Sequence, residues 1–266
     1  GLIENRGIST TYVNAYYLDA TSLQERRRQI EEIIQDGDVI KQDFQPRAYI
    51  LQMDFWLSHF NTNYWMPLII LIILIALAGL RSAPIETGIF TAGLTGTAAE
   101  LIMLMGIQVI FGYIYLYLAI IVTVFMTGLA SGALLANRVY GQITFLKFRA
   151  TQVFMAATAG ITAMSFLLIQ TFRLPDVLLH TIFISLTFLV AFVSGLLFAA
   201  AAQLRRSAIA LTTSRLYSTD LAGSAAGALL TSILMIPLLG LIRSLVLIII
   251  LNLLASLYSS IRKNVI

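Results

Sequence analysis

Apolar residues recur in long runs along most of this chain, and polar residues gather in the short stretches between the runs. A helix needs roughly 20 apolar residues to cross the hydrocarbon core of a bilayer. Seven segments approach or exceed that length: 64–80, 88–112, 116–136, 150–172, 177–203, 217–239 and 244–261. We therefore expect residues 64–266 to form an all-α integral membrane bundle of about seven transmembrane helices.

The first 63 residues follow another pattern. Gly7–Val13 is rich in β-branched residues and predicts a strand, whereas Thr21–Asp36 has one apolar stripe and predicts a helix. Pro46–Phe60 is rich in aromatic residues, and we interpret it as an amphipathic segment on the membrane surface. Residues 1–63 should thus be a short mixed α/β extramembrane segment with an interfacial lead-in. Because the chain starts at Gly1, we interpret it as a processed or incomplete product.

Composition supports the membrane assignment. Of 266 residues, 59% are hydrophobic and 11% are charged, and the mean hydropathy is +0.88. A soluble domain carries about 25% charged residues. These values exclude a simple soluble enzyme, a disordered tail or a nucleic-acid-binding module as descriptions of the whole chain. The absence of cysteine from the sequence excludes disulfides, cysteine-bound metals and thiol nucleophiles.

The charges predict an orientation. Residues 1–63 have a net charge of −3 and residues 64–266 a net charge of +7. With seven crossings, most lysines and arginines of the membrane part fall on the side opposite to the N-terminal segment. Basic loops stay in the cytoplasm. We therefore predict cytoplasmic basic loops and an extracytoplasmic N-terminal segment, in a membrane that we expect to be the cytoplasmic membrane of a bacterium.

A few polar residues fall within the apolar runs. Glu100 lies in the middle of the second segment, and Asp220 lies near the start of the sixth. A carboxyl group inside a membrane costs a few kcal/mol and usually faces the bundle interior. Small residues on the same helix faces would let neighbouring backbones approach closely. These candidate packing residues are Gly93, Gly96, Gly128, Gly132, Gly223 and Gly227.

Each polar residue has a functional and a structural interpretation. Glu100 could hold a proton or a cation, with His180 or Gln108 nearby, or it could hydrogen-bond a neighbouring helix, which we favour. Asp220 could contribute to an intramembrane site, but we favour a cap at its helix start or a pair with Arg215. For His180 an interfacial hydrogen bond is favoured over metal ligation. We expect no catalytic residues, no metal and no cofactor in this chain.

Two stretches resemble a known family. The first stretch, Thr91–Tyr140, includes the predicted helix with Gly93, Gly96 and Glu100 and the motif FMTGLASG. The second stretch, Arg215–Leu241, includes the motifs Y-x-x-D-x-x-G-x-x-x-G and PLLG. Both are similar to the membrane domain of spermidine-synthase-like membrane proteins, some of which are fusions of major-facilitator and spermidine-synthase type. Residues 8–17 (ISTTYVNAYY) and Gln45–Tyr49 (QPRAY) resemble the tail of the synthase-like domain.

The resemblance implies a methyltransferase-like soluble domain that transfers an aminopropyl group from decarboxylated S-adenosylmethionine to putrescine. The nucleotide-binding and acidic motifs of that domain match no position here. We therefore expect a membrane anchor or scaffold subunit, embedded in lipid and joined to other membrane or extracytoplasmic subunits, without nucleic acid. One alternative is a transporter of a polyamine or another small cation that uses Glu100. A second is the C-terminal part of a membrane-bound aminopropyltransferase.

Overall fold

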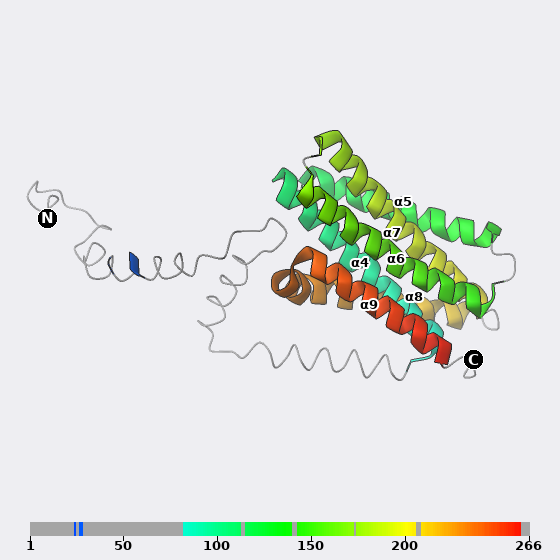
Figure 1. Ribbon diagram of the computed structural model, residues 1–266. Coiled ribbons are helices and arrows are strands. Elements are labelled where there is room, and N and C mark those ends of the chain that lie inside the picture. The colour runs from blue at the N-terminus through cyan, green and yellow to red at the C-terminus, as the bar shows by residue number, and fades with distance from the viewer. Residues whose placement is uncertain are drawn as a thin grey trace, which may run out of the picture. The chain divides into compact units, whose positions relative to one another are not determined.

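The computed structural model describes Gln24, Arg27, Arg28 and residues 82–112, 115–139, 143–172, 174–205 and 209–261 (Figure 1). The chain divides into two compact units, Gly1–Lys41 and Gln42–Ile266. In the first unit, Gln24, Arg27 and Arg28 are helical and exposed, and they fall inside the helix predicted over Thr21–Asp36. The predicted strand, the interfacial lead-in, the segment 64–80 and the boundary at residue 63 lie outside the described residues.

All regular elements in the described part of the second unit are helices. Its elements are α4 (Pro84–Phe111), α5 (Tyr115–Val139), α6 (Phe145–Thr171), α7 (Asp176–Leu204), α8 (Ile209–Leu230), the π-helical segment η2 (Thr231–Leu239) and α9 (Gly240–Ile261). The six predicted segments from 88–112 to 244–261 each fall on one of these helices, with α8 and η2 together covering 217–239. Five helical stretches of the described residues are long and apolar enough to cross a membrane.

Local sequence explains where α4 begins and ends. Pro84 occupies the first turn, where a missing N–H costs nothing, and the carboxylate of Glu86 accepts a hydrogen bond from the backbone N–H of Ala83 at 3.4 Å. The helix ends at Gly112, which has a φ of 74° and donates its N–H to the carbonyl of Gln108. Gly112, which the prediction placed at the end of the second segment, is therefore a left-handed residue just beyond the last residue of α4.

The last apolar stretch, Thr213–Ile261, folds back on itself. Gly223 and Gly227 of α8 meet the carbonyls of Phe90 and Leu94, so α8 runs parallel to α4. The Ser259 hydroxyl near the end of α9 donates to the Pro84 carbonyl at the start of α4, so α9 runs antiparallel to α4. The reversal occurs at Gly240, whose φ of 76° and ψ of 179° form a conformation essentially reserved for glycine. The stretch is thus two antiparallel arms.

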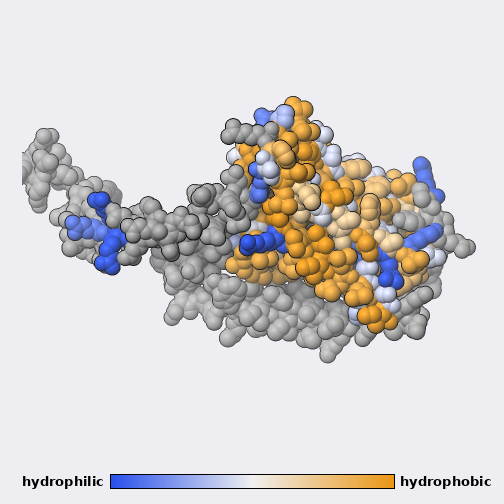
Figure 2. Space-filling view, in the orientation of Figure 1, coloured by the Kyte–Doolittle hydropathy of each residue, from blue (hydrophilic) through white to orange (hydrophobic). Residues whose placement is uncertain are grey.

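Helix contacts divide the bundle into close pairs. Helix α4 packs most extensively on α8, α5 on α7, and α6 on α9. The largest buried cluster gathers apolar side chains from α4, α5, α6, α7, η2 and α9, among them Ile102, Phe166, Phe183 and Leu245. Figure 1 shows the helices lying alongside one another, and Figure 2 shows apolar side chains over the visible face of the bundle with hydrophilic ones near its ends. This distribution suits a lipid-embedded protein.

Each described helix of the bundle begins before the segment predicted for it, and the difference is largest at α8. The sixth segment was expected to begin at residue 217, but α8 begins at Ile209, so Asp220 lies about three turns inside the helix rather than at its start. The favoured capping role of Asp220 is therefore wrong. The difference arises because an apolar run marks only the lipid-facing part of a helix, while backbone hydrogen bonds continue through polar residues at the membrane surface.

Candidate functional site

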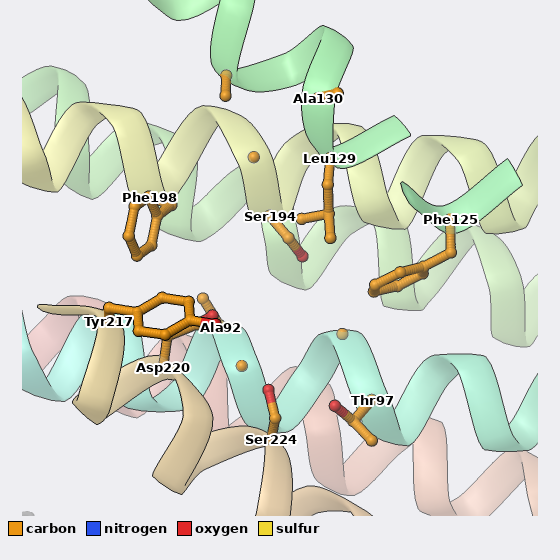
Figure 3. A pocket seen from close by; sticks show the side chains of 14 residues that line it. Ala92, Thr97, Phe125, Leu129, Ala130, Ser194, Phe198, Tyr217, Asp220 and Ser224 are labelled. Carbon is orange, nitrogen blue, oxygen red and sulfur yellow. The ribbon is translucent and has the colours of Figure 1, made fainter. Parts of the chain in front are cut away.

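A cavity of about 320 Å³ lies where the pair α4/α8 faces the pair α5/α7 (Figure 3). Its charged side chain is Asp220, and its hydroxyl groups come from Thr97, Ser194, Tyr217 and Ser224. The remaining lining is apolar or glycine: Ala92, Gly93, Gly96, Phe125, Leu129, Ala130, Ala133, Gly195 and Phe198. The cavity lies about 14 Å along the α4 axis from Pro84, because Gly93 is nine residues later and each residue rises about 1.5 Å.

Close packing of α4 on α8 brings Asp220 to this position. A Cβ atom at Gly93 would collide with the Asp220 carbonyl oxygen and lie 2.9 Å from its carboxyl oxygen Oδ1. Gly227 makes the next contact, since a Cβ there would lie 2.5 Å from the Leu94 carbonyl oxygen. Because glycine has no side chain, the two backbones touch. The carboxyl group of Asp220 thus lies directly against α4, at the edge of the cavity.

The facing helices approach each other in the same way. A Cβ at Gly128 would lie 2.8 Å from the Phe188 carbonyl oxygen, and one at Gly132 would collide with the Phe192 carbonyl oxygen. Gly195 of α7 makes the reciprocal contact with the Leu129 carbonyl and was not singled out from the sequence. Gly96 differs from the other predicted packing glycines, because its nearest neighbours are the Phe125 ring at 3.3 Å and the Ser194 hydroxyl at 3.4 Å. Gly96 therefore keeps space open in the cavity wall.

Glu100 lies outside this cavity. It borders a separate small space together with Ala99, Met103, Phe125, Thr187 and Val190, between α4, α5 and α7. That space has no room for a water molecule. Among the described residues, none forms a hydrogen bond or an ion pair with the Glu100 carboxyl group. The geometry therefore provides neither a wet path to Glu100 nor the expected hydrogen bond to a neighbouring helix.

The other two predicted polar residues lie far from Glu100. The His180 ring contacts Phe111 and Tyr117, with centroid separations of 4.3 and 5.3 Å, and its Nδ1 lies against the Asp176 carbonyl of its own helix. Phe111 is eleven residues after Glu100, or about 16 Å along α4. Gln108 is exposed. The structure thus places His180 in an aromatic cluster at one end of the bundle and does not bring it to Glu100.

A second polar region, not found from the sequence, joins α4 to α6 and α9. The buried Asn252 amide donates to the Thr95 hydroxyl at 2.7 Å, and the buried Gln152 amide donates to the Thr91 hydroxyl at 3.3 Å. Thr91 and Thr95 are one turn apart on α4. The amide oxygens of Gln152 and Asn252 accept no hydrogen bond from any described residue. This polar region could have been predicted from the amide side chains of Gln152 and Asn252, which stand within otherwise apolar segments of the sequence.

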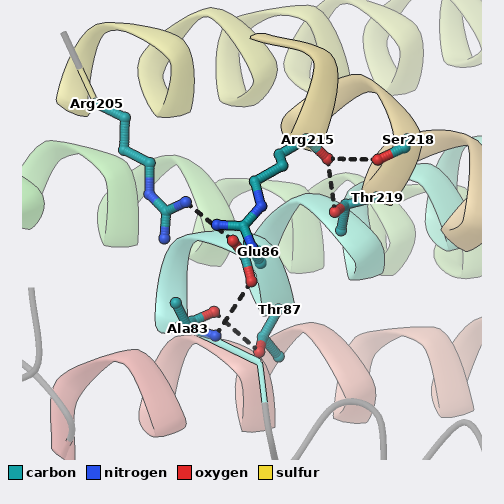
Figure 4. A network of polar contacts seen from close by, with 7 residues as sticks. All are labelled: Ala83, Glu86, Thr87, Arg205, Arg215, Ser218 and Thr219. Carbon is teal, nitrogen blue, oxygen red and sulfur yellow. Dashed lines mark hydrogen bonds and ion pairs between the residues drawn. The ribbon is translucent and has the colours of Figure 1, made fainter. Parts of the chain in front are cut away.

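Charged residues meet at one end of the bundle (Figure 4). The Arg205 guanidinium at the end of α7 lies 2.9 Å from the Glu86 carboxylate at the start of α4. Arg215 was expected to pair with Asp220, but none of the described residues forms an ion pair with Asp220. The Arg215 backbone carbonyl accepts hydrogen bonds from Ser218 and Thr219, at 2.9 and 2.8 Å. The Glu86–Arg205 pair links the start of α4 to the end of α7, whereas the Ser218 and Thr219 hydrogen bonds lie within α8.

The described residues contain no group of three or more histidines or acids placed to hold a metal ion. Comparison with known proteins does not extend these observations, because no family model, curated protein or solved structure matches the chain. The chemistry of the site therefore rests on its geometry. It combines one carboxyl group, several hydroxyl groups and aromatic walls within an apolar helix bundle.

Proposed function

We propose that this chain is the membrane anchor of a spermidine-synthase-like protein and a scaffold subunit of a larger membrane complex. The observation that carries this proposal is the direct backbone contact between α4 and α8 and between α5 and α7, made through Gly93, Gly223 and Gly227 and through Gly128 and Gly132. Backbones in contact over several turns form a stiff unit. Stiffness suits a subunit that holds other domains in fixed positions.

Buried hydrogen bonds support the same role. Asn252 and Gln152 tie α9 and α6 to successive threonines of α4. Most hydroxyl groups within the helices donate to a carbonyl one turn back, as Thr162 does to Thr158 at 2.9 Å. The interhelical bonds of Asn252 and Gln152 hold the bundle together, and hydroxyl groups bonded within their own helix offer little to a passing solute. The seven-crossing architecture expected from the sequence belongs to this proposal, with 64–80 as its first crossing.

The placement of basic residues supports the proposed orientation. Arg138, Lys147, Arg149, Arg205 and Arg215 lie near helix ends that the alternating chain direction brings to one end of the bundle. Arg243, near the start of α9, lies at the other end. Positively charged ends face the cytoplasm. The proposed extracytoplasmic location of the N-terminal segment follows from this bias.

Copurification tests the scaffold role. The tagged chain, extracted in a mild detergent, should elute with a partner that leaves the membrane fraction when this chain is deleted. Gly223→Leu should release that partner because the α4/α8 contact is lost, whereas Gly160→Ala should retain it, since a Cβ at Gly160 would meet only Ile249, at 3.8 Å. A chain that elutes alone, with every membrane protein still in place after its deletion, contradicts the proposal.

The second candidate is a transporter, and its motive is the carboxyl group of Glu100 in the middle of α4, a helix long and apolar enough to cross a membrane. Under this alternative, Glu100→Gln should abolish uptake of a polyamine by proteoliposomes that contain the full chain. Asp176→Asn is the matched control, because it removes a carboxylate from the exposed start of α7. Unchanged flux in Glu100→Gln rejects transport through Glu100 and leaves the scaffold proposal in place.

A further inference from the structure

The cavity beside Asp220 has the composition of a ligand site. Its volume of about 320 Å³ corresponds to the liquid volume of about eleven water molecules, at about 30 Å³ each. Pockets for small molecules begin at about 300 Å³ and combine apolar walls with a few polar groups. This cavity has one carboxyl group among mostly apolar surroundings. Its size and lining therefore suit a small organic molecule better than a bare ion.

The carboxyl group of Asp220 determines the charge of such a ligand. Within the described part of the chain, no side chain forms an ion pair with Asp220. A carboxylate inside a membrane protein is costly unless a positive charge or a hydrogen-bond donor meets it. The Asp220 side chain is half-buried, and its Oδ1 lies beside Gly93 of α4 at the edge of the cavity. A cation in the cavity would supply the missing partner.

Aromatic side chains of the cavity indicate the chemistry of the uncharged part of the ligand. Figure 3 shows Phe198 and Tyr217 at one end of the cavity and Phe125 at the other, with the Ser194 and Ser224 hydroxyls between them. Aromatic faces attract cations and also pack against hydrocarbon. Ala130 and Tyr217 are exposed, so the cavity opens at the outer surface of the bundle. An amphipathic molecule could enter from the surrounding lipid.

We propose that this cavity binds a small organic monocation, an amine with a hydrophobic body. Its ammonium group meets the Asp220 carboxylate, and its body packs between Phe125 and Phe198. One carboxylate neutralises one ammonium group. A polyamine would leave its further charges among apolar walls, where each unpaired charge is costly. The site is independent of the proposed scaffold role, and it lies at a different position from the Glu100 of the transport alternative.

Binding of 2-phenylethylammonium to the full chain in nanodiscs tests this proposal. Saturable binding at one site per chain is expected, with weaker binding of neutral 2-phenylethanol and of spermidine. Asp220→Asn should weaken binding by roughly tenfold or more, because the ion pair is lost. Asp176→Asn should leave the affinity unchanged, since Asp176 is exposed at the start of α7 and outside the cavity.

A second variant keeps the test decisive if Asp220→Asn does not fold. Ala130 is an exposed residue of the cavity wall, so Ala130→Phe should fill the opening without disturbing buried contacts and should abolish saturable binding. Retention of binding in Ala130→Phe, or equal affinity for the amine and the alcohol, would overturn the proposal. Non-saturable uptake that is the same in every variant would show partition into lipid and would also overturn it. Loss of the amine site would leave the copurification result unaffected.

Discussion

Single glycines control how closely the helices approach, and their effects differ by position. Gly93 and Gly223 face backbone atoms of a neighbouring helix, whereas Gly160 faces only the end of the Ile249 side chain. Backbone atoms cannot move aside as a flexible side chain can. The cost of adding a methyl group should therefore depend on what lies opposite rather than on the glycine's place in its own helix.

Gly223→Ala should lower the free energy of unfolding by about 1–3 kcal/mol, because the new Cβ would collide with the backbone of Phe90. Thermal unfolding in detergent measures the change. Gly160→Ala is the matched control and should be neutral or stabilising, since alanine favours helix by about 1 kcal/mol and the nearest atom is 3.8 Å away. Equal destabilisation of both variants would contradict close backbone contact at Gly223.

The buried amide of Asn252 gives a second prediction for individual residues. Thr95→Val and Asn252→Leu should each destabilise the bundle, and the double variant should cost less than the two single costs together. The expected coupling is about 0.6 kcal/mol, the usual size for a hydrogen bond between membrane helices, because the Asn252–Thr95 bond of 2.7 Å is lost only once. A double-mutant cycle from unfolding midpoints checks this. Strict additivity would indicate that the bond contributes nothing.

Sequence alone identified some of these residues. The spacing of Gly93, Gly223 and Gly227 from the nearby acids is visible along the chain, because one helix face repeats every three to four residues. Gly195 has no acid or second glycine at that spacing in its own helix. Its role as a packing residue is visible only in the structure, where α5 lies against it. The cavity could not be predicted from the sequence for the same reason. Four helices line it, and their mutual packing is a long-range property that no local pattern records.

At the scale of elements, apolar length located the helices well and their ends less well. The segment 177–203 corresponds closely to α7, but α8 extends eight residues before the predicted start at 217. Apolar runs report contact with lipid, whereas helix ends depend on backbone hydrogen bonds and capping. The π-helical segment η2 was also outside sequence prediction. Its Pro237 lacks a backbone N–H, and the wider π turn gives the ring room.

Among the described residues, two glycines have a positive φ, and they should tolerate substitution differently. Gly112 has a φ of 74° and a ψ of −2°, which asparagine can adopt, whereas Gly240 has a φ of 76° and a ψ of 179°, which is essentially limited to glycine. Gly112→Asn should therefore leave the unfolding midpoint nearly unchanged. Gly240→Asn should cost about 1–3 kcal/mol. Comparable midpoints for the two variants would show that the backbone at residue 240 is not strained by a side chain.

At the scale of the whole molecule, the absence of cysteine from the sequence makes orientation directly measurable. The exposed Arg138 lies at one end of the bundle, and Val177, which is 79% exposed, lies at the other. Single cysteines introduced at these positions should differ in reaction with a membrane-impermeant maleimide. Val177→Cys should react in intact cells and Arg138→Cys only after permeabilisation. The opposite pattern would reverse the proposed orientation and place the N-terminal segment in the cytoplasm.

The turn at Gly240 decides on which face of the membrane a fusion partner emerges. An uninterrupted helix over the 49 residues Thr213–Ile261 would be about 74 Å long, more than twice the roughly 30 Å of hydrocarbon that it would have to cross. The turn brings Ile261 back to the end where α4 starts. A fluorescent protein attached behind Ile261 should therefore share a compartment with one inserted ahead of Pro84. The backbone conformation of a single glycine thus sets on which side of the membrane an attached domain emerges.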